Sequence, residues 1–332
     1  MDPSNLALAA ARGLSPRFSA AYLECRLDPG DPRVDLLACV RRTKEPPKHA
    51  PRTFGGEIPD LAGRVLDDWD REGTALHRIA PLVWLEYDDV GNGRGPGSPS
   101  VCVCIERDYL EPGQFGPRRS EDWIEASAAM LDLPACPEEA RRSKATLEHI
   151  FASLPTEGRP IQFSVMSGRQ PSLAKLYARV PTAHLFPFLA DIGWRGSRSP
   201  IDAFLAAVRV TSPLIHVDLT LGPDGILPQV GLAFPALSRG HCFDEPLFRF
   251  AAAHVGEHAT AAGVAPALRR WADVHPTMPS GGAWPQVAHR WIDQKVVFPA
   301  AGPPQLKVYL GLRIVPLLLA AMRSAPNAHR KA

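Results

Sequence analysis

The sequence predicts an α+β fold: an antiparallel β-barrel built from repeated α-β-β-α units, with the helices outside. Three observations predict it. Four segments of alternating apolar and polar residues are each divided by a turn rich in Gly or Pro, the signature of a β-hairpin. Segments with helical periodicity and capping residues separate these hairpins. Within each strand one parity is apolar and the other polar, which fits a barrel with helices on one face and a polar interior.

The elements follow in order along the chain. Before residue 81 the pattern is less regular, and we expect helices near residues 15–28 and 58–71 with a strand at residues 34–40. The predicted hairpins span residues 81–109, 161–180, 213–234 and 291–313. The predicted helices span residues 120–131, 136–154, 199–210 and 244–263, each opening near a Ser, Asp or Pro suited to a helix start.

The length and composition are those of a globular protein. The chain has 332 residues, of which 45% are hydrophobic and 22% charged. We expect a single domain over residues 1–332, with residues 324–332 as a flexible tail. The net charge of +2 offers no general attraction to nucleic acid or to an anionic membrane. Six cysteines without matched spacing do not indicate a disulfide framework.

The two ends of the chain bear on its location. The N-terminus carries an acidic residue at once and lacks a basic segment followed by a long apolar stretch, so no signal peptide is predicted. The longest apolar run is interrupted by Arg313 and Pro316 and is too short to span a bilayer. We therefore expect a cytoplasmic protein.

The polar parity of the strands predicts the residues that line the barrel. A merely solvated sheet face would carry more Glu, Lys, Thr and Ser, whereas this parity also carries Trp, Tyr, Met, Gln and Cys. Such a mixture suits a half-wet cavity that holds an amphiphilic ligand. The residues of this parity include Trp84, Glu86, Cys102, Cys104, Gln162, Ser164, Met166, Lys175, Tyr177, Arg179, His216, Asp218, Thr220, Gln229, Lys307, Tyr309 and Arg313.

Two strands repeat one motif on that parity. Lys175 and Tyr177 stand in "KLY", Lys307 and Tyr309 stand in "KVY", and Glu86 stands in "WLEYD" on an early strand. With the helix–hairpin–helix order over residues 80–315, these motifs resemble the ABBA prenyltransferases, the αββα-barrel enzymes that alkylate aromatic rings. The resemblance implies an allylic diphosphate as donor and an aromatic small molecule or peptide side chain as acceptor.

The resemblance also implies a role for each candidate residue. Lysines, arginines and tyrosine hydroxyls would stabilise the charge of the leaving diphosphate, aromatic walls would shield the cation, and a carboxylate would take the acceptor's proton. The expected diphosphate-binding residues are Lys175, Tyr177, Arg179, Lys295, Lys307, Tyr309 and Arg313. The expected catalytic residues are Glu86, His216 and Asp218, and the expected substrate-binding residues are Trp84, Gln162, Met166 and Gln229. No Asp-rich motif for magnesium is found, so neither a metal nor another cofactor is expected.

Other interpretations remain open. "HVGEH" matches the spacing of an inverted zincin, and His254, His258 and Cys242 could bind a metal, although histidines without a ligand role are far commoner. A cavity with acids and bases could also serve a metal-independent cyclase or lyase that adds thiols to dehydroamino acids in a ribosomally made peptide. A third interpretation is a non-catalytic barrel that binds peptides.

Overall fold

The computed structural model describes ten segments of the chain, and their strands form one antiparallel sheet. The segments are residues 18–27, 33–40, 60–89, 98–104, 120–208, 213–233, 245–254, 258–271, 274–277 and 286–316. The strands are β1 (Phe18–Arg26), β2 (Val34–Val40), β3 (Leu82–Tyr87), β4 (Ser100–Cys104), β5 (Arg159–Val165), β6 (Ala174–Pro181), β7 (Leu214–Gly222), β8 (Gly225–Ala233), β9 (Val274–Thr277), β10 (Gln286–Phe298) and β11 (Gln305–Pro316).

The sheet closes into a ten-stranded antiparallel barrel. Its neighbours run in the order β11-β1-β2-β3-β4-β5-β6-β7-β8-β10, and β10 also pairs with β11, which completes the ring. The short strand β9 extends the sheet by pairing with the first residues of β10. Closure removes the free sheet edges and separates an inner face from an outer face.

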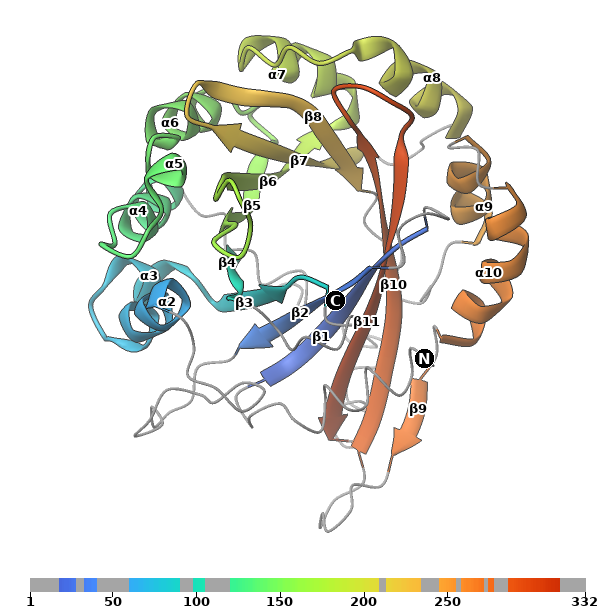
Figure 1. Ribbon diagram of the computed structural model, residues 1–332, viewed down its shortest axis with the longest axis horizontal. Helices are drawn as coiled ribbons and strands as arrows, with labels where there is room; N and C mark the ends of the chain where they lie inside the picture. Colours follow the sequence, from blue (N-terminus) through green and yellow to red (C-terminus); the bar gives the residue numbers. More distant parts are fainter. Residues whose placement is uncertain are drawn as a thin grey trace, which may run out of the picture.

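Helices lie on the outside of the barrel, as Figure 1 shows in a view into its interior. They follow successive pairs of strands along the chain. The helices are α2 (Asp60–Asp70), α3 (Ala75–Ile79), α4 (Ser120–Leu131), α5 (Glu138–Arg141), α6 (Lys144–Ala152), η2 (Thr182–His184), α7 (Leu185–Asp191), α8 (Arg198–Val208), α9 (Glu245–His254) and α10 (His258–Trp271). Within the described segments, no helix combines the length and the apolar character needed to cross a membrane.

The main hydrophobic core fills the layer between the helices and the outer face of the barrel. Trp69 of α2 is completely buried there, and its indole Nε1 donates a hydrogen bond to the carbonyl of Ala80 at 2.6 Å. Val83 and Leu85 of β3 join the same core. A smaller cluster lies on the inner face, where it includes Tyr22, Trp84, Cys102, Cys104 and Ile161. The alternating pattern of the strands thus supplies two separate apolar layers.

Most of the predicted elements are confirmed. All four predicted hairpins are present, as are the strand at 34–40 and helices at 58–71, 120–131 and 199–210. The helices predicted at 136–154 and 244–263 are each divided in two, and the second of the latter pair continues to Trp271. The helix predicted near residues 15–28 is wrong, because Phe18–Arg26 is strand β1. Its Ala, Leu, Glu and Arg residues favour a helix, but pairing with β2 and β11 overrides that preference. The tail at 324–332 lies outside the described residues.

One strand also departs from the predicted parity. Since Gln162, Ser164 and Met166 were predicted to face inward, Ile161 and Phe163 on the other parity would face the helices, yet Ile161 belongs to the inner cluster and lines the cavity. The register of β5 against β6 shifts between Pro160 and Gln162. An extra residue in one strand of a pair reverses the alternation locally. The shift brings Ile161 inside next to Gln162.

Candidate functional site

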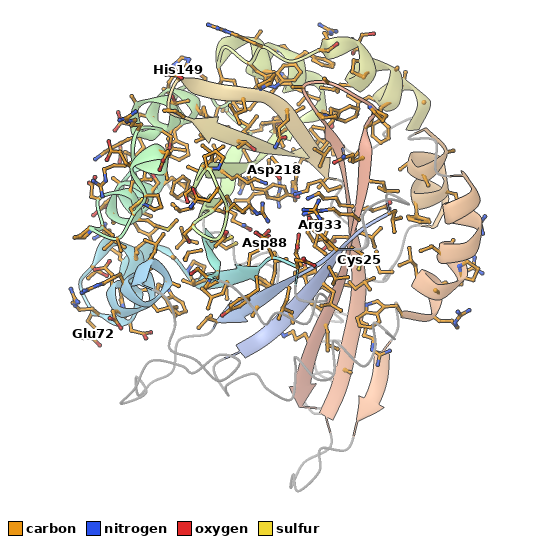
Figure 2. All side chains as sticks on the ribbon, in the orientation of Figure 1. Cys25, Arg33, Glu72, Asp88, His149 and Asp218 are labelled. Carbon is orange, nitrogen blue, oxygen red and sulfur yellow. The ribbon has the colours of Figure 1, made fainter. Side chains whose placement is uncertain are left out.

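The barrel encloses a cavity to which strands from all around the ring contribute. Figure 2 shows Asp218 and Asp88 toward the barrel interior, whereas Glu72 and His149 lie among the outer helices. The cavity is lined by Tyr22, Glu24, Leu37, Leu82, Trp84, Glu86, Cys104, Ile161, Gln162, Ser164, Met166, Arg169, Lys175, Tyr177, Asp218, Ala233, Asp293, Gln294, Lys295, Lys307 and Tyr309.

Most of the residues singled out in the sequence lie on this cavity. They are Trp84, Glu86, Gln162, Met166, Lys175, Tyr177, Asp218, Lys295, Lys307 and Tyr309. The structure does not place the remaining four among the lining residues. His216 and Arg179 lie behind Tyr177, Gln229 donates a hydrogen bond to Thr220 Oγ1 at 3.1 Å, and Arg313 is buried on β11. Cys242 and the side chains of His254 and His258 lie outside the described part of the chain.

Asp218 is the counter-ion of two lysines. Its Oδ2 lies 2.7 Å from Nζ of Lys295 on β10 and 3.8 Å from Nζ of Lys175 on β6. Burial alone would raise the pKa of Asp218, but the two ammonium groups outweigh burial and lower it to about 2. Asp218 is therefore ionised at neutral pH. Asp218 and His216 lie on the same face of β7, as predicted. The ion pairs that the structure describes for Asp218 are with Lys175 and Lys295.

A glycine makes the contact between Lys295 and Asp218 possible. Lys295 stands on β10 and Asp218 on β7, with β8 between them. At Gly231 of β8 a Cβ atom would meet Lys295 Cδ at 3.1 Å and Asp218 Cβ at 3.0 Å. The missing side chain leaves the space in which Lys295 crosses the intervening strand.

The second Lys-Tyr pair is bound to a carboxylate of β1. Lys307 Nζ, which is half-buried, donates to the buried Glu24 Oε1 at 2.5 Å. Burial would raise the pKa of Glu24, but Lys307 and Lys295 hold the pKa of this carboxyl well below its usual range. Lys295 Nζ also lies 5.2 Å from the ring centroid of Tyr309, within the range of a cation–π contact. The three lysines are thus linked through Asp218, Glu24 and Tyr309.

Glu86 is bound by an arginine from the turn between β5 and β6. Arg169 Nη2 donates to Glu86 Oε1, and Arg169 also holds Asp88 at 2.6 Å. Burial raises the pKa of Glu86 above its ordinary value, and the Arg169 guanidinium only partly offsets burial. Glu86 is therefore a stronger base than an exposed glutamate, and Arg169 fixes its direction.

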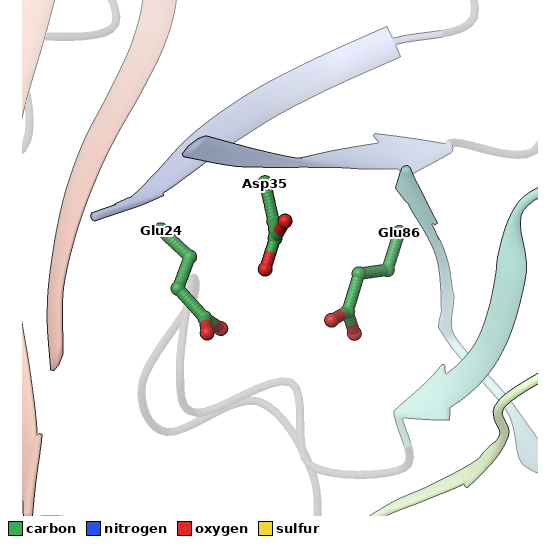
Figure 3. Close-up of side chains that lie close together, drawn as sticks. All are labelled: Glu24, Asp35 and Glu86. Atoms are coloured by element: carbon green, nitrogen blue, oxygen red, sulfur yellow. The ribbon is translucent and has the colours of Figure 1, made fainter. Parts of the chain in front are cut away.

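Glu24, Asp35 and Glu86 form a cluster of carboxylates, with one oxygen of each within 4.8 Å of the others (Figure 3). Within the part of the chain that the structure describes, this is the cluster of side chains whose spacing could hold a divalent cation. Each carboxylate already has a basic partner, because Arg26 lies 3.0 Å from Asp35, just as Lys307 binds Glu24 and Arg169 binds Glu86. The geometry is therefore that of three ion pairs side by side, which need no metal for charge balance.

Aromatic residues form the other part of the wall. The ring of Tyr22 lies 5.3 Å from that of Trp84, 5.2 Å from that of Trp291 and 6.3 Å from that of Tyr309. Tyr22 donates a hydrogen bond to Asp293 at 2.9 Å and accepts one from Trp291 Nε1 at 2.9 Å. Aromatic faces next to an acidic group can bind a ring or a cation.

Sequence reasoning missed Tyr22, Glu24, Asp35, Arg169 and Asp293. Tyr22 and Glu24 were missed because β1 was interpreted as a helix, and strand parity would have placed both inside. Asp293 stands two residues before Lys295 on the same face, so that the same rule would have found it. Arg169 stands in a turn, for which neither parity nor periodicity gives a direction.

The chain was also compared with known protein families and with curated proteins. A scan of this chain against protein-family models finds no match, and a search of curated proteins finds none either.

Proposed function

We propose that this protein transfers a prenyl group from an allylic diphosphate to an aromatic acceptor, either a small molecule or a Trp or Tyr side chain of a peptide. One observation carries the proposal. Lys175, Lys295 and Lys307 come from three strands and line one cavity with three tyrosines, inside a closed antiparallel barrel surrounded by helices. The proposal includes the finer fold assignment, a barrel of repeated αββα units like that of the ABBA prenyltransferases.

The proposed reaction breaks the allylic C–O bond and leaves its electron pair on the diphosphate. The lysines and tyrosine hydroxyls stabilise this leaving group as its charge grows. The allylic cation is shielded by the faces of Tyr22, Trp84 and Tyr309, which line the same cavity. The acceptor ring then forms the new bond to the allylic carbon and gives its proton to Glu86, a base of raised pKa.

Binding a diphosphate would have a cost, because the lysines already have partners. Among the described lining residues, the four cations Arg169, Lys175, Lys295 and Lys307 face four carboxylates. The diphosphate must take the place of Asp218 on Lys295 and of Glu24 on Lys307. In return, the lysines are held in position before the ligand arrives, so that no further ordering is required.

The test offers labelled dimethylallyl and geranyl diphosphate together with indoles, phenols and peptides containing Trp or Tyr. We expect one donor to bind by calorimetry and to give a prenylated product. Lys307→Ala should lower turnover about a hundredfold at saturating donor, because one charge-stabilising group is lost. Glu86→Gln should act mainly on the step that involves the acceptor. Lys144→Ala, which removes an exposed lysine of α6 paired with Asp132, is the matched control. Absence of binding by either diphosphate at millimolar concentration refutes the proposal.

A second candidate is favoured by the same charge balance. A wall of paired acids and bases suits proton transfer within a neutral ligand, such as thiol addition to a dehydroamino acid of a peptide. Here Glu86 would take the thiol proton as the C–S bond forms, and a lysine would give a proton to the α-carbon. Incubation with a dehydrated peptide would then consume a free thiol without a change in mass.

A further inference from the structure

Behind the cavity, three side chains form a hydrogen-bonded chain that the proposed reaction does not yet use. His216 of β7 is completely buried. Its Nε2 lies 3.1 Å from Nε of Arg179, and its Nδ1 lies 3.3 Å from the hydroxyl of Tyr177. Arg179 and Tyr177 share the inner face of β6, and only Tyr177 of the three lines the cavity.

The arginine fixes the tautomer of His216. A guanidinium only donates hydrogen bonds and does not lose its proton in proteins, so Nε2 of His216 must be the acceptor. In a neutral imidazole the other nitrogen then carries the proton. Nδ1–H of His216 therefore donates to the oxygen of Tyr177. Burial first, and Arg179 second, lower the pKa of His216 to about 3, so the ring is neutral at physiological pH.

The direction of this chain decides what Tyr177 can do. Its oxygen accepts from His216, so its own O–H proton points elsewhere. Among the residues that the structure describes, His216 is the hydrogen-bond partner found for this hydroxyl, and the rest of the ring contacts the cavity. Burial, reinforced by Asp293 and Asp218, raises the pKa of Tyr177 well above its ordinary value, which keeps the proton on the hydroxyl.

We infer that Tyr177 is a fixed hydrogen-bond donor to an oxyanion bound in the cavity, and that Arg179 and His216 are positioning residues that set its direction. The identity of the oxyanion, a phosphate oxygen of the leaving group, rests on the proposed function. His216 is then neither a general acid nor a general base. The described residues around His216 are Arg179 and Tyr177 of β6 and Ala233 of β8. Lys295 of β10 pairs with Ala233 on the far side of β8.

The first test measures the tautomer directly and needs no activity. In protein labelled with ¹⁵N-histidine, two-bond ¹H–¹⁵N correlations should show His216 protonated at Nδ1 and should not change between pH 5 and pH 8. The spectrum of His216→Asn, which lacks these signals, assigns them. A proton on Nε2, or a titration within this range, overturns the inference.

The second test uses inorganic pyrophosphate and the preferred allylic diphosphate. Tyr177→Phe and His216→Leu should each lower pyrophosphate affinity and turnover about tenfold or more, since one charge-assisted donor is lost or misdirected. The double variant should be no worse than Tyr177→Phe alone, because both changes remove the same hydrogen bond. His216→Asn keeps an N–H near the position of Nδ1 and should restore part of the loss. Equal defects in the Asn and Leu variants would indicate a merely structural histidine and overturn the inference.

The outcomes separate the two proposals. An Nδ1–H tautomer in a protein that binds neither pyrophosphate nor an allylic diphosphate refutes prenyl transfer and the oxyanion assignment together, while the direction of the hydrogen bonds from Arg179 to Tyr177 stands. Pyrophosphate binding with an Nε2–H tautomer refutes the positioning role and leaves prenyl transfer in place.

Discussion

Replacing Asp218 with asparagine should strengthen the binding of a diphosphate, although it removes a partly buried ion pair. Asp218 lies 2.7 Å from Lys295 Nζ and occupies the place that a phosphate oxygen would take. A second oxygen at the same distance from this nitrogen would lie at most twice 2.7 Å, about 5.4 Å, from the carboxylate oxygen. At an effective dielectric constant of about 20, two unit charges so placed repel each other by about 3 kcal/mol.

The gain in affinity will be smaller than this repulsion, because Asp218 also supports the charge of Lys295. Burial lowers the pKa of Lys295, and Asp218 is the main group that raises it again. The asparagine variant therefore has a less basic lysine. We expect pyrophosphate affinity to rise about tenfold to a hundredfold at pH 6, where Lys295 stays protonated, and less at pH 8.

Isothermal calorimetry with inorganic pyrophosphate measures this effect on wild type and variant at both pH values. Asp202→Asn removes the same charge from an exposed pair with Arg198 on α8 and should leave the affinity unchanged. If Asp218→Asn binds pyrophosphate no better than wild type at pH 6, while its thermal unfolding shows an intact fold, the three lysines are not the anion site.

Three further predictions concern the same wall. Gly231→Val should push Lys295 away from Asp218, because a Cβ at this position meets Lys295 Cδ at 3.1 Å; the Lys295 pKa, followed by NMR, should fall. The lowered pKa of Asp218, about 2 against a usual 3.8, supplies stability that is complete above pH 3.8 and lost as the pH falls toward 2. Urea unfolding should show this loss, about 2 kcal/mol, in wild type and not in Asp218→Asn. Burial raises the pKa of Cys102 to about 12, so mass spectrometry should detect its alkylation at pH 8 only after unfolding.

The strands of the four hairpins and most of their inward residues were predictable because parity is a local property, whereas β1 was not. Lys175 and Tyr177 face the cavity as their spacing requires, and so do Lys307 and Tyr309. Partners were not predictable, because they depend on register and closure. Nothing local indicates that Lys307 binds Glu24, 283 residues away, or that Lys295 crosses a strand to reach Asp218. The bulge that turns Ile161 inward and the direction of Arg169 also arise only when β5 and β6 pair.

Strand β10 organises both parts of the cavity because each of its neighbours has a glycine at the right position. Trp291 lies across Gly311 of β11, where a Cβ would meet the indole at 2.3 Å, and so reaches Tyr22 of β1. Lys295 stands four residues after Trp291 on the same face of β10. It lies across Gly231 of β8 and reaches Asp218 of β7. The aromatic part and the charged part are therefore set by one strand, four residues apart. Because these contacts already hold the side chains in place, an oxyanion bound as proposed would only have to exchange with a carboxylate, without movement of the barrel.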